Sequence, residues 1–301
     1  RESTQRKLDH WDRLFLRAEE LRELESASVL DKAQTVERLC RIMIGREERI
    51  LSLAKQHFTL GDLLEIKSRM IGTGFIGGKA VGMLLANKIV SKDPVFAKTG
   101  QLEQPDSFYV GSDVFYTYLV ENGWWKRRME QKTEEGYFTV AAELKEKMLT
   151  GRFPDQIRDE FQEMLEYFGQ SPIIVRSSSL LEDAFGNAFA GKYESFFCVN
   201  QGDPEDRLAH FEDMVRQVYS SMMGEDALTY RLQRGLDQQD EQMALLIQRV
   251  SGSYRKMYFL PDLAGVGVSH NTFAWNSQLD PKAGMLRLVV GLGTRAVNRV
   301  E

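Results

Sequence analysis

A short apolar run that leads directly into an arginine and three serines constrains this chain most. Ile173, Ile174 and Val175 predict a buried strand. Arg176 and the serines at 177–179 follow at once, before an acidic pair and a small-residue turn. A guanidinium and hydroxyls at a strand end suit phosphate oxygens. Two interpretations stay open at this point: a polyphosphate cradle, or a plain strand followed by a polar turn and a capped helix.

Composition excludes several classes of protein. Hydrophobic residues make up 43% of the 301 residues and charged residues 28%, which is typical of a globular protein of about two domains. The net charge of −5 disfavours a general nucleic-acid binder. The sequence contains neither an apolar run of membrane-spanning length nor a signal peptide, so we expect a cytoplasmic protein without a membrane partner.

Two cysteines, Cys40 and Cys198, are far apart in the sequence. We expect buried free thiols, because two distant cysteines support neither a disulfide framework nor a zinc site. The chain starts at Arg1 and stops just after an apolar run and a glycine turn. This pattern indicates a fragment of a longer protein.

The first 68 residues differ from the rest. They are rich in charge, almost free of glycine and proline, and apolar at helical spacing, which predicts two or three amphipathic helices. We expect a packed helical extension over residues 1–68, with a coiled-coil linker or dimerisation arm as the alternative. From Ile71 onward strands alternate with helices. This pattern predicts a layered α/β (α+β) fold with two lobes.

Several further elements follow from local signals. A strand and a helix capped near Ser112 or Asp113 are expected within 105–120. Helices are expected within 138–168, with Pro154 near a start, and within 204–236. Apolar runs predict strands at Met243–Val250, Met257–Val268 and Met285–Val290.

A second candidate site is the glycine-rich stretch that begins at Gly72. Its spacing resembles a dinucleotide fingerprint, but no clear strand precedes it, and a Walker A loop fails because Ala80 stands at the Ser/Thr position. What remains is a turn at Gly77 and Gly78, then Lys79 and a helix. Backbone N–H groups at a helix start favour anions, and the lysine can reach a phosphate. The alternative is a glycine hinge with a solvated lysine.

These segments resemble the ATP-binding domain shared by phosphoenolpyruvate synthases, pyruvate phosphate dikinases, rifampin phosphotransferases and glucan water dikinases. The matched segments occur in the family's order from about residue 71 to 297, with residues 1–68 outside the resemblance. They are Gly77–Leu84, Pro105–Phe108, Val175–Ser178, Glu182–Asp183, Phe189–Ser195, Met243–Val250, Gly265–Asn271 and Gly291–Gly293.

The resemblance implies a two-lobed ATP-grasp-like fold, with residues 69–240 as the first lobe and 241–301 as the second, truncated one. ATP would sit between the lobes. Lys79 and Arg176 would be catalytic, stabilising the charge on the transferring group. The residues implied in binding ATP are Gly77, Gly78, Lys79, Arg176, Ser177, Ala190 and Gly191 near the phosphates, and Gln248, Arg249 and Val250 at the adenine edge.

The resemblance also implies Mg²⁺ and a phosphohistidine swivel domain, neither of which the sequence identifies. Arg287 stands where the family places an acidic residue, and Thr294 where a glutamate follows Gly-Leu-Gly, so we name no metal ligand. None of the four histidines lies in a Thr-x-His motif. We therefore expect the ATP-binding part of a dikinase-like phosphotransferase, an enzyme that passes phosphate to a histidine outside this chain. The alternatives are a non-catalytic nucleotide sensor and a scaffold without nucleotide.

Overall fold

The computed structural model divides the chain into two compact units, Arg1–Arg249 and Val250–Glu301. Each unit is described by itself. The division follows Arg249, whereas the sequence-based boundary lay between residues 240 and 241, because the strand Met243–Arg249 belongs to the sheet of the first unit. The structure describes residues 9–24, 26, 28–99, 102–182, 191–271 and 278–293.

A five-stranded mixed sheet forms the centre of the first unit. Its order is β1-β2-β5-β3-β4, with β1 parallel to β2 and the other neighbours antiparallel. β5 is the central strand, and all six residues from Met243 to Gln248 are buried, as its continuous apolar run predicted. The strands are β1 (Met70–Ile71), β2 (Ser107–Val110), β3 (Ile173–Ser179), β4 (Ser195–Cys198) and β5 (Met243–Arg249).

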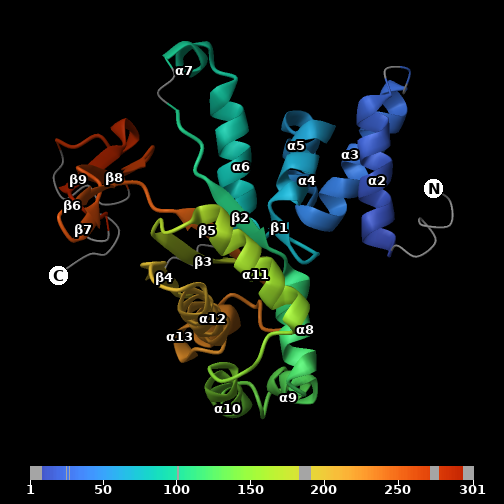
Figure 1. Ribbon diagram of the computed structural model, residues 1–301, viewed down its shortest axis with the longest axis vertical. Helices are drawn as coiled ribbons and strands as arrows, with labels where there is room; N and C mark the ends of the chain where they lie inside the picture. The colour runs from blue at the N-terminus through green and yellow to red at the C-terminus, as the bar shows by residue number, and fades with distance from the viewer. Residues whose placement is uncertain are drawn as a thin grey trace. The chain divides into compact units, whose positions relative to one another are not determined.

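Helices cover both faces of this sheet (Figure 1). Local signals set several of their ends: Thr59 and Asp62 form a reciprocal capping box before α5, and Pro204 starts α12 after Asp203. The helices are α2 (His10–Glu23), α3 (Val29–Met43), α4 (Glu48–His57), α5 (Leu60–Ser68), α6 (Gly78–Ser91), α7 (Pro94–Thr99), α8 (Ser112–Glu121), α9 (Trp125–Gln131), α10 (Thr139–Met148), α11 (Asp155–Phe168), α12 (Pro204–Ser221) and α13 (Glu225–Gln233).

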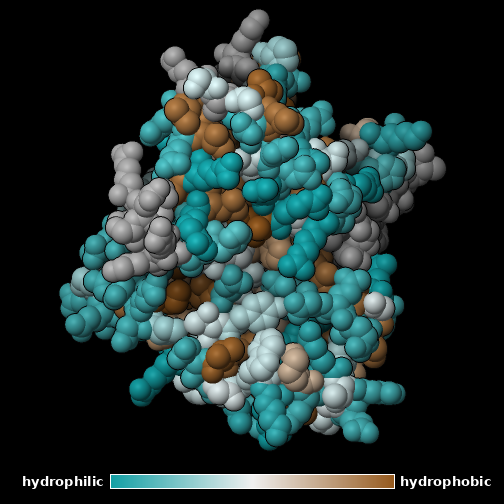
Figure 2. Space-filling view, turned by 90° about the vertical axis from the view of Figure 1, so that its right-hand side faces the viewer, coloured by the Kyte–Doolittle hydropathy of each residue, from teal (hydrophilic) through white to brown (hydrophobic). Residues whose placement is uncertain are grey.

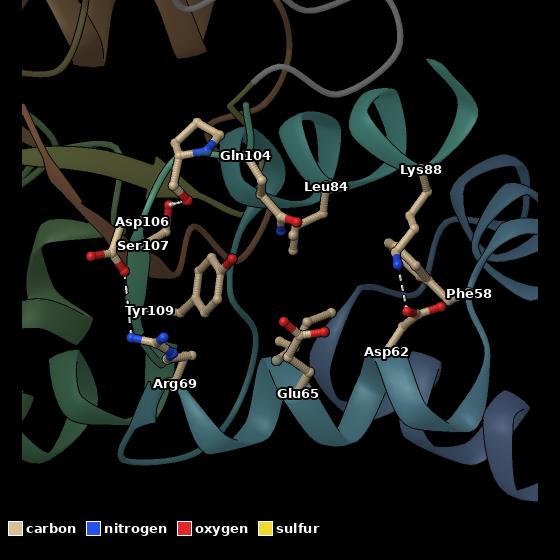
Figure 3. A pocket seen from close by; sticks show the side chains of 12 residues that line it. Phe58, Asp62, Glu65, Arg69, Leu84, Lys88, Gln104, Asp106, Ser107 and Tyr109 are labelled. Carbon is tan, nitrogen blue, oxygen red and sulfur yellow. Dashed lines mark hydrogen bonds and ion pairs between the residues drawn. The ribbon is translucent and has the colours of Figure 1, made fainter. Parts of the chain in front are cut away.

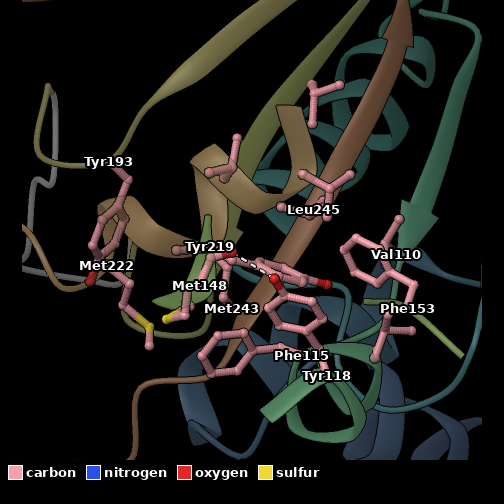
Figure 4. Close-up of a cluster of buried hydrophobic side chains, with 14 of the residues drawn as sticks. Val110, Phe115, Tyr118, Met148, Phe153, Tyr193, Tyr219, Met222, Met243 and Leu245 are labelled. Atoms are coloured by element: carbon pink, nitrogen blue, oxygen red, sulfur yellow. Dashed lines mark hydrogen bonds between the residues drawn. The ribbon is translucent and has the colours of Figure 1, made fainter. Parts of the chain in front are cut away.

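One face of the sheet packs against α8 and α10–α13 in an aromatic core. Tyr118 and Phe153 stack with ring centroids 4.6 Å apart, and Tyr219 and Phe115 lie edge to face beside them (Figure 4). The hydroxyl of Tyr118 donates to the carbonyl oxygen of Met148 at 2.6 Å, so this buried phenol is satisfied. These contacts hold the helices that follow β2 and β3 against the sheet.

The opposite face packs against α2–α6. Tyr109 and Leu246 point to this side, while their strand neighbours Val110 and Leu245 belong to the aromatic core. Leu39 of α3 and Leu63 of α5 are fully buried in the same cluster. The helices α2–α5 therefore pack against the sheet and α6. Figure 2 views the side on which α2–α5 lie in Figure 1 and shows mainly hydrophilic residues, with apolar ones in separate groups.

Three expectations need correction. The first 68 residues contain four described helices instead of two or three, because breaks near residues 45 and 58 divide the periodic runs. The helix after β2 is capped by Gly111; the Ser112 hydroxyl instead accepts from the backbone N–H of Phe75 at 3.0 Å. The apolar stretch from Met257 forms two short strands, β7 (Tyr258–Leu260) and β8 (Leu263–Val268).

The second unit consists of two antiparallel strand pairs in its described part. β6 (Ser253–Arg255) pairs with β7, and β8 pairs with β9 (Met285–Val290) in a register that sets Val266 opposite Arg287. A 3₁₀ turn, Pro281–Ala283, precedes β9.

Both cysteines are free and buried, as expected, and burial raises the pKa of the Cys40 thiol to about 12. Across the described residues, no helix is long and apolar enough to cross a membrane.

The shared core makes a testable prediction for the helical segment. Leu39→Ala removes a fully buried side chain and should lower the free energy of unfolding by about 2 to 5 kcal/mol. Leu30→Ala on the same helix, at a residue that is 66% exposed, should change it by less than about 0.5 kcal/mol. Urea unfolding followed separately at Trp11 and Trp124 measures this. A lower unfolding midpoint in the Trp11 signal alone, with the Trp124 signal unchanged, would show that the helices unfold independently of the sheet.

Candidate functional site

The first turn of α6 lies directly against the end of β3. The hydroxyl of Ser178 donates to the carbonyl oxygen of Ile76 at 2.9 Å and accepts from the backbone N–H of Ala80 at 3.0 Å. Gly77 has φ of +81°, and a Cβ there would lie 1.4 Å from the Ser178 carbonyl oxygen. At Gly78 a Cβ would lie 1.8 Å from the carbonyl oxygen of Glu182. Both positions therefore require glycine.

Lys79 is held by a carboxylate and a hydroxyl. Its Nζ lies 2.7 Å from Oε1 of Glu182 and donates to Oγ of Ser177 at 3.2 Å. Ser177 in turn donates to the same Glu182 oxygen at 3.0 Å. The backbone N–H of Ser179 donates to the other carboxylate oxygen. The lysine ammonium is thus fixed beside the end of β3.

Glu182 is 3% exposed and is the acidic member of this cluster. Burial raises the pKa of its carboxyl above the ordinary value, and the positive charge of Lys79 opposes that rise. The motif that contains Glu182 was identified from the sequence, but its role as the anchor of Lys79 was not. The three serines from Ser177 to Ser179 are fully buried within β3, not in a turn after the strand. Their burial is possible because each of the three hydroxyls has a hydrogen-bond partner in the protein.

Arg176 is connected to α6 through a glutamine. Its Nη1 donates to Oε1 of Gln248 at 3.1 Å, and Nε2 of Gln248 lies 3.1 Å from Oγ of Ser107 and 3.2 Å from Sδ of Met83. Met83 follows Lys79 by one helical turn, so the two share a face of α6. The structure therefore brings Lys79, Ser177, Arg176 and Gln248 to one junction between α6 and β3.

Arg249 lies outside that junction. Its Nε donates to Oδ2 of Asp106 at 3.0 Å, its guanidinium stacks over the ring of Phe168, and Nη1 bonds Ser171. The side chain is thus engaged at the end of β5, and the backbone N–H of Arg249 donates to the carbonyl oxygen of the same Asp106 at 3.0 Å. Val250, its predicted neighbour at the adenine edge, is the first residue of the second unit.

The predicted small-residue turn is only partly described. Ala190 lies outside the described residues, and Gly191 has φ of +70°. Gly191 lines a hollow of about 540 Å³ together with Lys192 of its own segment and with Ser221 and Gly224 near α12 and α13. Neither Lys79 nor Arg176 lines this hollow. The turn therefore stays a predicted member of the site.

A residue that sequence reasoning missed holds the motif in place. Oε2 of Glu241 accepts from the hydroxyl of Tyr193 at 2.6 Å, and Oε1 accepts from the backbone N–H of Leu181 at 3.2 Å. One carboxylate, 1% exposed, thus ties together two segments that lie on either side of residues 183–190. The only sequence signal was a charged residue two positions before the apolar run of β5.

The described residues do not fit a metal site. They contain no group of three or more histidine, cysteine, aspartate or glutamate residues close enough to hold a metal ion. Arg287, at the position where an acidic residue was expected, lies on β9 opposite Val266. We therefore assign no chemical step to Mg²⁺ in this chain.

The contact at Gly77 leads to a prediction with a matched control on the same helix. Gly77→Ala places a methyl group into the Ser178 carbonyl at positive φ and should lower the free energy of unfolding by about 3 kcal/mol or more. Gly82→Ala, in the exposed interior of α6 with nothing within 4 Å, should instead raise it by about 0.5 to 1 kcal/mol. Thermal and urea unfolding of both variants test this. Equal stabilities would contradict the close packing.

The burial of Glu241 predicts a pH dependence. Burial raises the pKa of this carboxyl, so the folded protein holds its proton more tightly than the unfolded chain does. Its stabilising contribution is present below the unfolded value of 4.5 and is lost as the pH rises through the folded pKa. The free energy of unfolding of Glu241→Gln, relative to the parent, should therefore increase from pH 4.5 upward.

Urea titrations at several pH values measure this difference. Exposed Glu121 provides the control, because Glu121→Gln removes the same charge without altering a buried group. If the difference in the free energy of unfolding between Glu241→Gln and the parent stays constant with pH, the buried-carboxylate interpretation is refuted.

Comparison with known proteins identifies the family. The family model described as pyruvate phosphate dikinase, AMP/ATP-binding domain, matches residues 73–301. A rifampicin phosphotransferase from a Streptomyces species is 28% identical over 124 residues, covering 41% of this chain and 14% of that protein. The phosphoenolpyruvate synthase of Neisseria meningitidis serogroup B is 24% identical over 177 residues, covering 54% of this chain and 22% of that enzyme.

The phosphoenolpyruvate synthase of Escherichia coli is similar to the same extent, at 26% identity over 174 residues, with 54% of this chain and 20% of that enzyme covered. The chain thus spans less than a quarter of the length of these relatives. The match begins between α5 and α6, so the helices α2–α5 lie outside it. The resemblance inferred from the motifs is confirmed: the chain belongs to the family that carries the AMP/ATP-binding domain of pyruvate phosphate dikinase.

Proposed function

We propose that residues 73–301 are the ATP-binding part of a dikinase-like phosphotransferase that passes phosphate from ATP to a histidine on a domain outside this chain. The family assignment supports ATP as the ligand. The observation that carries the proposal is the α6–β3 junction, where Lys79 of α6 is bonded to Ser177 of β3. Arg176, the residue before Ser177, is linked to Met83 of the same helix through Gln248. Two cations on neighbouring elements are the arrangement that a polyphosphate needs.

Each cation would make a different contact. The planar guanidinium of Arg176 presents forked donors that match two phosphate oxygens, whereas the ammonium of Lys79 acts as a point charge. α6 contributes as well, because the partial positive charge at its N-terminus favours an anion. Gly77 and Gly78 would contribute by letting the first turn of α6 approach the carbonyl oxygens of Ser178 and Glu182, which brings the helix start and Lys79 to the end of β3.

Glu182 would position Lys79. The carboxylate holds the ammonium beside Ser177, so the charge is oriented before a phosphate arrives. Catalysis would then consist of positioning and charge stabilisation by Lys79 and Arg176, with no protein nucleophile in this chain. Mg²⁺, when bound, would neutralise phosphate charge in a full-length protein; the described residues supply no site for it.

The rest of the nucleotide site is an extension of this proposal. Gly191 and Ala190 would border the phosphates, and the end of β5, from Gln248 through Arg249 to Val250, would lie along the adenine edge. The two units would then correspond to the lobes of an ATP-grasp-like fold. Dimerisation through the N-terminal helices remains a prediction.

A specific observation also supports a second function, a non-catalytic nucleotide sensor. A cation, Arg287, occupies β9 where family members place an acidic residue, and the segment after Gly293 departs from the family pattern. A site of this kind can bind ATP without transferring phosphate. The helices α2–α5 pack directly on α6 and could then transmit the bound state.

Nucleotide affinity tests the site. Arg176→Ala should weaken ATP binding by at least about tenfold, the effect of losing charge-assisted hydrogen bonds of about 1.5 to 3 kcal/mol. Arg176→Lys should give an intermediate loss, and Lys79→Ala a loss similar to that of Arg176→Ala. Arg127→Ala, at a side chain that is 46% exposed on α9, is the matched control and should leave affinity unchanged. Calorimetry on correctly folded variants measures each value.

Unchanged ATP affinity in both Arg176→Ala and Lys79→Ala would refute the nucleotide site. If the site holds, a second measurement on the full-length protein separates the two functions. AMP formation with an acid-labile phosphohistidine supports the phosphotransferase, and tight binding without turnover supports the sensor.

A further inference from the structure

A pocket of about 230 Å³ lies between α5, α6 and the segment that leads into β2 (Figure 3). Neither Lys79 nor Arg176 lines it. Nearly half of its lining residues precede residue 73, where the family match begins, so the pocket is not a property of the matched domain alone. It is lined by Phe58, Asp62, Glu65, Ile66, Arg69, Leu84, Lys88, Gln104, Pro105, Asp106, Ser107 and Tyr109.

The charges in the lining leave one carboxylate over. Nζ of Lys88 lies 2.5 Å from Oδ1 of Asp62. Asp106 is paired with two cations, Arg69 at 3.5 Å and Arg249, which does not line the pocket, at 3.0 Å. Glu65 forms no ion pair with any residue that the structure describes. Glu65, an exposed residue of α5, therefore presents the one unpaired charge among the described lining residues, and this charge is negative (Figure 3).

A buried hydroxyl faces the same space. Tyr109 is 4% exposed, and its phenol points into the pocket, where it has no hydrogen-bond partner among the described residues (Figure 3). Burial raises the pKa of this phenol; the charge of Glu65 adds to the rise, and the charge of Arg69 opposes it. A ligand that hydrogen-bonds this phenol would therefore make a contact for which no described protein group competes.

We propose that this pocket binds a small organic cation, with a primary ammonium group between Glu65 and Tyr109. A short aliphatic chain would lie against Phe58, Ile66 and Leu84, the apolar part of the lining. The volume is below the range of about 300 to 1,000 Å³ typical of drug-sized ligands, so it fits a compound with few carbon atoms. This proposal does not rest on ATP binding, since no member of the α6–β3 junction lines the pocket.

Three probes of nearly equal size and different charge test the ligand class. We would titrate n-butylammonium, n-butanol and butyrate into the protein at pH 7 and matched ionic strength, and measure affinity by NMR shifts. n-Butylammonium should bind at millimolar concentration, at least about fivefold more tightly than n-butanol, the effect of an exposed ion pair of about 1 kcal/mol. Butyrate should not bind. The shifted resonances should belong to pocket residues.

Two variants assign the contacts. Glu65→Gln should remove the preference for n-butylammonium over n-butanol. Tyr109→Phe should lower the affinity for both n-butylammonium and n-butanol about fivefold, because each can hydrogen-bond the phenol. The variant should fold normally, because it removes a polar atom that lacks a partner in the protein. Glu163→Gln, at an exposed glutamate on α11, loses the same charge and should leave all affinities unchanged.

Four results would overturn the proposal: no saturable binding of n-butylammonium, equal or tighter binding of n-butanol or butyrate, a preference that survives Glu65→Gln, or shifts that map outside the pocket.

Discussion

The contact between the first turn of α6 and the last residues of β3 is the constraint on which the candidate site depends. Backbone meets backbone there, because the carbonyl oxygens of Ser178 and Glu182 occupy the places where Gly77 and Gly78 would carry a Cβ. This closeness sets the start of α6, and the start of α6 sets the distance from Lys79 to Ser177 and Glu182. Glycine at two positions therefore controls where the ammonium group of the next residue, Lys79, is placed.

Elements whose signal is local could be predicted from the sequence. The apolar run of β5 is buried on both faces, and the helix that begins at Gly78 follows the glycine turn as expected. The burial of Ser177 to Ser179 could not be predicted, because a hydroxyl is buried only when it finds a partner. The hydroxyls of Ser177 and Ser178 find partners about a hundred residues earlier, at Ile76, Lys79 and Ala80. The Ser179 hydroxyl instead accepts from the nearby backbone N–H of Glu182.

The candidate site shows the same limit. Lys79 and Arg176 were selected by their chemistry, and the structure adds the groups that hold them: Glu182 for the lysine, and Gln248 for the arginine. Glu241 escaped notice because its partners, Tyr193 and Leu181, lie far from it in the sequence and its own neighbours form no motif. For Arg249 the sequence position matches the family's adenine edge, but the structure shows that its side chain is hydrogen-bonded to Asp106.

The core shared by the helices and the sheet has a consequence for how this domain can be inherited. The family match begins at residue 73, but the physical unit does not, because Ile76, Val81 and Leu84 near the start of α6 are buried together with Leu39 and Leu63. Gene fusion or recombination at residue 73 would transfer an open apolar face to the new protein. The helices must therefore travel with the nucleotide domain, or another partner must replace them at the same surface.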